Sequence, residues 1–439
     1  MPQEIDKRQH LLPMDAPAPV WRPIHYLGSK LRLAESIREM IDRVDPSGGA
    51  VCDLFAGSGT VSLALSQTRS VVAADIQEYS RVLCKAVLNP ASLEAKDVAD
   101  FLRHASTLRA DLESCLEPVL AFEERAIEHS NVSPELLCDV SENGSLIVGK
   151  PESRELAKCL EEVRQRINSC NAAASLVTTR YFGGSYFAYR QTFDLDCHLA
   201  AIRSSRETYL AAILSTASFI VNSVGKQFAQ PMRPRRKDGT IKSHLISQMC
   251  RDRSHDVTKI LTGWIDTYRS LRQGHKHRVV RGDYREVLKS LEGISIIYAD
   301  PPYTRDHYSR FYHVLETMCL GDSPDVSTTS LSGEGASSRG LYRTDRHQSP
   351  FCIKTQAPKA FLELFEGARQ LPLLLSYSPF VKDGHPRMMT IEAIALLARK
   401  FYSHVEVVQA GQMTHSKLNK TDLHRDAPED AEVFLVCQS

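Results

Sequence analysis

The sequence predicts an α/β protein with a Rossmann-like, doubly wound sheet and a large, mainly helical insertion. Three observations support this fold class. Residues 50–55 form a short apolar run that ends in a glycine turn, and a helical run follows at once. Residues 70–75 form a second apolar run that ends in an acid, and residues 294–300 form a third one much later. Strand, glycine turn, helix and strand in this order open a doubly wound sheet.

The remaining elements follow from the same reading. The helix after the first strand is expected at residues 60–65. Apolar, β-branched runs of this length are typical of strands buried on both faces. In addition to those three, strands are expected at 277–281, 371–377, 405–408 and 432–436.

Between the strands expected at 70–75 and 277–281, the apolar residues recur at helical spacing instead. They are Val98, Leu102, Ala105, Leu108, Leu112 and Cys115, and later Leu156, Leu160, Val163 and Ile167. This stretch is too long for a loop. We therefore predict one core formed by residues 1–90 and 276–439, and an inserted helical domain at 91–275. The Ser/Thr/Gly-rich segment 322–339 is predicted to be a mobile loop.

Composition narrows the function classes. The net charge is +1, so any attraction to nucleic acid must be local. No apolar run approaches the ~20 residues that a membrane span requires, and residues 1–23 lack the apolar core of a signal peptide. The eleven cysteines contain no Cys-x-x-Cys pair. We expect a cytoplasmic protein with no membrane partner and no metal.

The turn Phe55-Ala-Gly57-Ser-Gly59 is the first candidate for a ligand site. It lacks the Gly-Lys-Ser/Thr ending of a phosphate loop, the third glycine of a dinucleotide fingerprint and the Gly-x-Ser-x-Gly of a nucleophile elbow. A bulky uncharged ligand can lie against such a backbone. Asp75, at the end of the next strand, is then placed for two ribose hydroxyls. The alternative is a turn that only packs a helix on a strand.

The segment Asp300-Pro301-Pro302-Tyr303 is the most informative one. An apolar strand delivers the acid, and two prolines stiffen the turn that follows. The carboxylate and the Pro301 carbonyl can accept the two hydrogens of an aromatic amine, which frees the nitrogen lone pair for attack on a methyl group. The tyrosine ring offers a face to an extruded base. Asp283 has two readings, a contact with a cofactor or a helix N-cap.

Together these residues resemble the Dam-like adenine-specific DNA methyltransferases. Tyr26-Leu-Gly28-Ser-Lys30 is similar to the motif that precedes the glycine turn in that family. The resemblance implies S-adenosylmethionine as cofactor, with Tyr26 and Lys30 near its methionine end. The implied cofactor residues are Tyr26, Lys30, Asp53, Phe55, Gly57, Gly59, Asp75 and Asp283, and the implied catalytic residues are Asp300, Pro301, Pro302 and Tyr303.

The family places its target-recognition domain where the insertion lies here. Within it, Arg233, Arg235, Arg236 and Lys237 form a proline-stiffened basic loop, which suits phosphates and guanine edges or is simply a solvated charge run. Arg305, beyond the tetrad, is a second candidate contact. The aromatic and glycine-rich run 181–189 is equally compatible with base stacking and with core packing.

The sequence therefore predicts a methyltransferase acting on the 6-amino group of adenine in double-stranded DNA, with the adenine flipped out. A cognate restriction endonuclease or defence components are expected partners. Two rivals stay open. One keeps the enzyme and changes the substrate to RNA or to the amine of cytosine, although the family's cytosine enzymes tend to carry Ser in place of Asp300. The other is a non-catalytic DNA-binding subunit with a vestigial fold.

Overall fold

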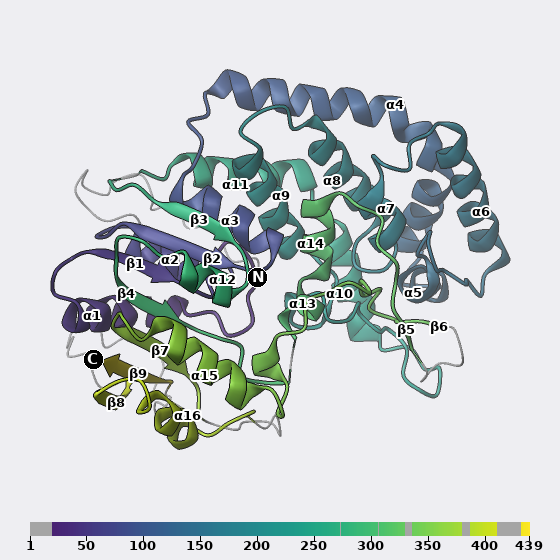
Figure 1. Cartoon of the computed structure of the whole chain (residues 1–439). Coiled ribbons are helices and arrows are strands. Elements are labelled where there is room, and N and C mark those ends of the chain that lie inside the picture. Colours follow the sequence, from purple (N-terminus) through teal and green to yellow (C-terminus); the bar gives the residue numbers. More distant parts are fainter. Residues whose placement is uncertain (1–19, 273, 306, 330–335, 380–386, 411–431) are drawn as a thin grey trace, which may run out of the picture.

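A seven-stranded sheet forms the centre of the protein in the computed structural model, which describes residues 20–272, 274–305, 307–329, 336–379, 387–410 and 432–439. The strand order is β3-β2-β1-β4-β7-β9-β8. The strands are β1 (Ala50–Asp53), β2 (Val71–Asp75), β3 (Arg278–Arg281), β4 (Ile294–Ala299), β7 (Leu373–Tyr377), β8 (His404–Gln409) and β9 (Val433–Gln438). Every predicted strand is present, and the predicted fold class is confirmed (Figure 1).

The direction of the chain through the sheet fixes where a ligand can bind. Strands β3, β2, β1, β4 and β7 are parallel, whereas β9 runs antiparallel to both β7 and β8. From β1 the chain builds outward to β2, and after the insertion it adds β3 beyond β2 and then returns to add β4 on the other side of β1. Such a reversal of strand order opens a crevice at the carboxyl ends of the strands. The glycine turn follows β1 and Asp300 follows β4, so both lie at this crevice.

Both faces of the sheet are covered, which explains why its central strands are apolar throughout. Val51 and Tyr298 belong to one buried cluster, and their chain neighbours Cys52 and Ile297 belong to another. The first cluster includes residues of α1 (Ala34–Val44), α2 (Thr60–Leu65) and α3 (Glu78–Leu88). The second includes residues of α12 (Tyr284–Lys289), α15 (Ala357–Ala368) and α16 (Ile391–Ala398).

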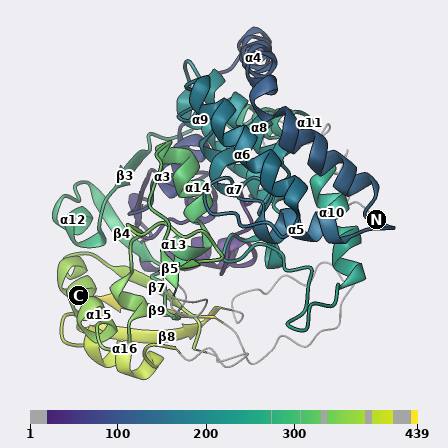
Figure 2. The same ribbon diagram turned by 90° about the vertical axis from the view of Figure 1, so that its right-hand side faces the viewer.

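The insertion is helical and lies beside the sheet (Figures 1 and 2). Its helices are α4 (Ala95–Glu128), α5 (Glu135–Asn143), α6 (Arg154–Ser169), α7 (Val177–Phe182), α8 (Tyr189–Ala201), α9 (Arg206–Ile220), α10 (Ser243–Arg253) and α11 (Val257–Arg269). Helices α9 and α11 contribute to the same buried cluster as α3. The second half of α4 instead packs with α5, α6 and α10 around a third cluster. The limits of a separate domain within 91–275 stay a prediction.

The aromatic run 181–189 belongs to the interior. Its five aromatic side chains are at most 5% exposed. Tyr186 donates a hydrogen bond to the Phe228 carbonyl at 2.7 Å, and Gln191, two residues beyond the run, donates to the Asp252 carbonyl at 2.8 Å. Of the two readings of this run, the structure therefore favours core packing over base stacking.

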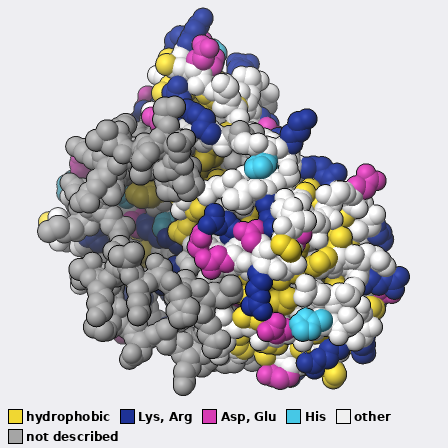
Figure 3. All heavy atoms as spheres, turned by 90° about the vertical axis from the view of Figure 1, so that its left-hand side faces the viewer, with side chains coloured by type: hydrophobic (Ala, Val, Ile, Leu, Met, Phe, Trp, Pro, Cys, Tyr) yellow, Lys and Arg dark blue, Asp and Glu magenta, His cyan; other side chains and the backbone are white. Residues whose placement is uncertain are grey.

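After α13 (Tyr308–Phe311) and α14 (His313–Leu320), the described part of the Ser-rich segment contains two short strands. Strands β5 (Thr328–Thr329) and β6 (Ala336–Ser337) pair antiparallel, and residues 330–335 of the predicted mobile loop lie outside the described residues. On the face in Figure 3, basic and acidic side chains are interspersed. Within the described residues, no helix is long and apolar enough to cross a membrane.

A buried ion pair ties two parts of the insertion together. Glu123 of α4 pairs with Arg253 of α10, and the two side chains are 3% and 0% exposed. Arg253 also donates to the Gly184 carbonyl at 2.6 Å, and Glu123 accepts from the Tyr189 amide at 2.6 Å. The other acids of α4 are mostly exposed, so Glu123 stands apart from them.

We predict that Glu123→Gln lowers the free energy of unfolding by about 3–5 kcal/mol, because it leaves the Arg253 charge buried without a counter-ion. The matched control is Arg125→Ala, which breaks the pair with Glu155 where both side chains are more than half exposed, and which should cost less than about 1 kcal/mol. Urea unfolding followed by circular dichroism measures both. Equal losses in the two variants would contradict the ranking.

Candidate active site

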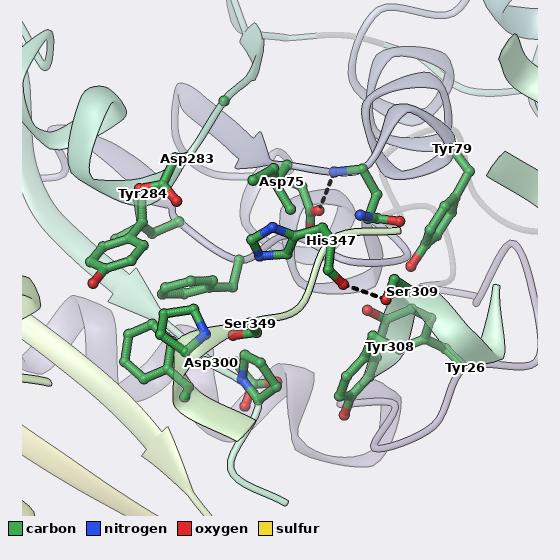
Figure 4. A pocket seen from close by; sticks show the side chains of 18 residues that line it. Tyr26, Asp75, Tyr79, Asp283, Tyr284, Asp300, Tyr308, Ser309, His347 and Ser349 are labelled. Carbon is green, nitrogen blue, oxygen red and sulfur yellow. Dashed lines mark hydrogen bonds between the residues drawn. The ribbon is translucent and has the colours of Figure 1, made fainter. Parts of the chain in front are cut away.

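A pocket lies at the carboxyl ends of β1, β2 and β4 (Figure 4). Its empty space is about 800 Å³, including the solvent at its mouth. Six predicted site residues contribute to its wall: Tyr26, Phe55, Asp75, Asp283, Asp300 and Pro302. Other wall residues come from segments that the motifs did not single out, among them Tyr79, Tyr284, Tyr308, Ser309, His347 and Phe351.

Asp75 is held in place by backbone amides. One carboxylate oxygen accepts from the Gly57 amide at 3.0 Å, and the other accepts from the Gln77 amide at 2.9 Å. Burial raises the pKa of this carboxyl above its usual range, and the two backbone hydrogen bonds oppose that rise. The glycine turn and the acid at the end of β2 are therefore one unit.

Gly57 has to be glycine for two reasons. Its φ of +53° lies in the left-handed region, and an added Cβ would lie 2.6 Å from the Tyr26 hydroxyl. Tyr26 in turn stacks on Tyr312, with ring centroids 4.9 Å apart, and lies 5.5 Å from the ring of Tyr308. The N-terminal motif and the segment after the tetrad thus form one aromatic wall. Gly59, with φ +76°, is the N-cap residue of α2.

Of the two predicted readings of Asp283, the helix N-cap is confirmed and the contact with a cofactor stays a prediction. Its side chain accepts from the Arg285 amide at 3.0 Å and so caps α12, and the residue also lines the pocket. His347 faces the same space (Figure 4). Burial lowers the pKa of His347, although Asp283 and Asp75 act in the opposite direction. We therefore expect a neutral imidazole at the wall at neutral pH.

Asp300 is paired on one side only. Its Oδ2 lies 2.8 Å from Lys30 Nζ, whereas its Oδ1 is buried and has no hydrogen-bond partner among the described residues. Burial raises the pKa of Asp300 to about 6, Lys30 opposes this rise, and Glu432 adds to it. At neutral pH the group is thus mostly a carboxylate, and one of its oxygens is an acceptor without a partner among the described residues.

Lys30 and Tyr303 lie outside the set of residues that line the pocket. Lys30 Nζ also lies 2.7 Å from Glu432 Oε1. The Tyr303 hydroxyl donates to the same oxygen at 3.3 Å, and its ring packs against Tyr377 and Arg387. Sequence reasoning missed Glu432, for which the only available signal was an acid at the start of a predicted strand.

Asp53 is another predicted site residue that does not line the pocket. It is 1% exposed, and its Oδ2 accepts from the Ser62 hydroxyl at 2.6 Å, while its Oδ1 has no partner in the part of the chain that the structure describes. Burial raises the pKa of Asp53 to about 7. The side chain borders the buried start of α2.

The predicted DNA-contacting residues differ in their surroundings. Arg233, Arg236 and Lys237 are exposed, and within the described residues none of them forms an ion pair. Arg235 is only 15% exposed and pairs with Glu142 at 2.7 Å. Arg305 is exposed.

Comparison with known proteins agrees with this geometry. Residues 26–115 match the family described as D12 class N6 adenine-specific DNA methyltransferase. The chain is 24% identical over 370 residues to the type II methyltransferase M.FokI of Planomicrobium okeanokoites, covering 81% of this chain and 44% of that protein. It is 21% identical to the modification methylase LlaI of Lactococcus lactis subsp. lactis, covering 94% and 54%.

A third relative is the type II methyltransferase M.NlaIII of Neisseria lactamica, 23% identical with 81% and 83% covered. The predicted resemblance to adenine-specific DNA methyltransferases is confirmed. The chain spans about half the length of the first two relatives. Methyltransferases of that family in general use S-adenosylmethionine as the methyl donor.

The raised pKa of Asp53 predicts that the stability of this fold depends on pH. Its folded pKa of about 7 lies above the ~3.9 of an unfolded Asp, so the unfolding free energy falls as pH rises from about 4 to 7. Asp53→Asn removes that term. Relative to wild type, the unfolding free energy of the variant should therefore rise by roughly 3–4 kcal/mol between pH 4 and pH 8. Urea unfolding at a series of pH values measures the gain, and parallel curves for the two proteins would refute it.

Proposed function

We propose that this chain transfers a methyl group from S-adenosylmethionine to the 6-amino nitrogen of an adenine flipped out of double-stranded DNA. One observation carries the proposal: Asp300 lines the same pocket as Asp75 and Phe55, and its Oδ1 is buried without a hydrogen-bond partner within the described residues. An unpaired buried acceptor is costly to leave, and the amine of a base is the kind of donor that would satisfy it.

The pocket suits the proposed cofactor. Asp75, fixed by two amides, would accept from the ribose hydroxyls, while Phe55 and Tyr284 would flank the adenine and Asp283 would accept from its amine. When bound, the cofactor supplies an electrophilic methyl group on a sulfonium centre. Tyr26 would lie at the far wall, beside Gly57.

The protein's part in the chemistry is to redistribute the electrons of a poor nucleophile. The lone pair of the adenine amine is delocalised into the ring. Asp300 Oδ1 and the Pro301 carbonyl would accept its two hydrogens, which favours tetrahedral nitrogen and exposes the lone pair. Lys30 holds the second oxygen of Asp300, so the free oxygen has a fixed direction. Ordered acceptors of this kind need no reorganisation during the reaction.

Extrusion of the base costs a few kcal/mol and requires compensating contacts. We propose that Tyr303 supplies one of them, as the resemblance implies. Because Tyr308 lines the pocket, it offers a second ring on which the base can stack, worth about 1–3 kcal/mol.

A chain of arginines supports a path for the DNA backbone from the basic loop to the pocket. Arg339 donates to the carbonyls of Pro231 and Met232, at 3.4 and 3.3 Å, and so joins the loop to the segment that carries His347. Arg310 and Arg346 both lie against the ring of Tyr342, at 4.8 and 5.4 Å. Within the described residues, neither forms an ion pair, so both charges are available to phosphates.

The relatives are named as type II and modification enzymes. We propose a cognate restriction endonuclease that reads the same DNA sequence as the partner of this chain. Its role would be to cut DNA that this chain has left unmethylated.

The catalytic proposal predicts that two substitutions separate binding from chemistry. Asp300→Asn should lower single-turnover methylation of a duplex by at least a hundredfold, about 2.7 kcal/mol of barrier, because its amide cannot replace a charged acceptor. The Asp300→Asn variant should bind the cofactor with an affinity within a few fold of that of wild type. Asp75→Ala should weaken cofactor binding by roughly 1.5–3 kcal/mol. Calorimetry and a filter-binding rate assay measure both. An Asp300→Asn variant that keeps more than about a tenth of the wild-type rate, a loss below ~1.4 kcal/mol, would contradict the role of Asp300.

The DNA path predicts a change in salt dependence. Replacing Arg233, Arg236 and Lys237 with alanine should flatten the slope of log affinity against log salt by about two to three units, since each phosphate contact contributes about 0.9. The control is Arg235→Ala, which removes a charge already paired with Glu142 and should change the slope by less than about one unit. Fluorescence anisotropy with a short duplex measures the slopes, and superimposable lines for the triple variant and wild type would mean that the loop does not touch DNA.

A further inference from the structure

Lys30 lies between two carboxylates that come from distant parts of the chain. Asp300 follows β4, and Glu432 precedes β9. Lys30 Nζ lies 2.8 Å from Asp300 Oδ2 and 2.7 Å from Glu432 Oε1. The three side chains are 6%, 20% and 13% exposed, so water screens this cluster only weakly.

The cluster uses the full donor capacity of the lysine. An ammonium has three N–H groups, and Lys30 directs them to Asp300, Glu432 and the Gly28 carbonyl at 3.3 Å. Two negative charges therefore share one positive charge. Within the described residues, all three donors are thus directed to protein oxygens, and the place near the cofactor that the family resemblance implies for Lys30 stays a prediction.

We propose that Glu432 is a positioning residue for methyl transfer: by competing with Asp300 for Lys30, it sets the charge state and direction of the carboxylate that receives the target amine. The inference rests on the proposed function. Glu432 is not one of the residues that line the pocket. Its effect reaches the reacting group through Lys30 and through Tyr303, whose hydroxyl donates to the same Glu432 oxygen.

The sign of the electrostatic effect follows from the groups around Asp300. Burial and the charge of Glu432 favour its neutral form, and Lys30 favours its ionised form. Within the described residues, the other titratable or charged neighbours of the cluster are Tyr298, Tyr303, Tyr308, Asp53 and Arg387. Burial raises the pKa of each of the three tyrosines far above neutrality, so they carry no charge in the relevant range. Removing the charge of Glu432 would therefore make Asp300 easier to ionise and extend activity to more acid pH.

Two substitutions separate the charge of Glu432 from its geometry. Glu432→Gln keeps an oxygen that can accept from Lys30 and Tyr303 but removes the negative charge. Glu432→Ala removes both. Glu406→Gln is the matched control, because Glu406 lies on the neighbouring strand β8, is 44% exposed and pairs with Arg43 and His404 at the surface.

The experiment is the pH dependence of the single-turnover methylation rate of a DNA duplex, measured with the full chain at saturating S-adenosylmethionine. For wild type, the rate should fall on the acid side with a midpoint near the pKa of Asp300, about 6. Glu432→Gln should shift this midpoint to lower pH by about one unit. Glu406→Gln should leave it in place. Glu432→Ala should lower the rate on the plateau further than Glu432→Gln does, because Tyr303 and Lys30 lose their acceptor.

The outcomes are distinct. An acid limb that coincides in the Glu432→Gln variant and wild type, with both proteins folded by circular dichroism, overturns the role of Glu432 while the proposed function stands. An acid limb that disappears in the Glu432→Gln variant assigns the titration to Glu432 itself and also overturns the proposal. A wild-type chain that methylates no adenine in the duplex refutes the proposed function, and the inference falls with it.

Discussion

The site depends on the ion pairs that the ammonium of Lys30 forms with Asp300 and Glu432. The ammonium is buried, and it joins the N-terminal motif, the tetrad after β4 and the final strand at one nitrogen. Burial alone would lower the pKa of Lys30, but Asp300 and Glu432 raise it well above its usual value. The lysine is therefore a permanent cation, and it makes the burial of two carboxylates tolerable.

Three acids gather near the carboxyl ends of adjacent parallel strands, and each is stabilised by a different means. Asp53 accepts from one serine hydroxyl, and burial raises its pKa to about 7. Asp75 accepts from two backbone amides, which suits an ionised acceptor for hydroxyl groups. Asp300 is paired through one oxygen, and its other oxygen has no partner within the described residues. Different environments for similar groups let one edge of the sheet combine a structural acid with two acids of proposed function.

The parts of this arrangement that rest on local patterns could be predicted from the sequence. Strands β1, β2, β4, β7 and β9 follow from apolar runs, because a largely buried strand has a distinctive composition. The edge strands β3 and β8 are more exposed and mix charged with apolar residues. The glycine turn and the tetrad carry their chemistry within a few residues. The aromatic run 181–189 was undecided, since stacking and core packing require the same residues, and only the tertiary structure shows that it is buried.

The parts that depend on distant contacts could not be predicted. Glu432 reaches Lys30 across nearly the whole length of the chain, and no spacing connects them. Arg235 looked equivalent to its neighbours in the basic loop, and its pairing with Glu142 is visible only in three dimensions. Sequence patterns thus identified most of the acids and bases of the site, and the fold determined which of them are paired with each other.

The central claim is that the pocket presents an adenine amine to Asp300. The most direct test incubates the full chain with a DNA duplex and S-adenosylmethionine whose methyl group carries deuterium, digests the DNA to nucleosides and identifies the labelled product by mass spectrometry. The account predicts label on the 6-amino nitrogen of deoxyadenosine, and its absence from the Asp300→Asn reaction. Label on deoxycytidine, or label found only when RNA replaces the duplex, would contradict it.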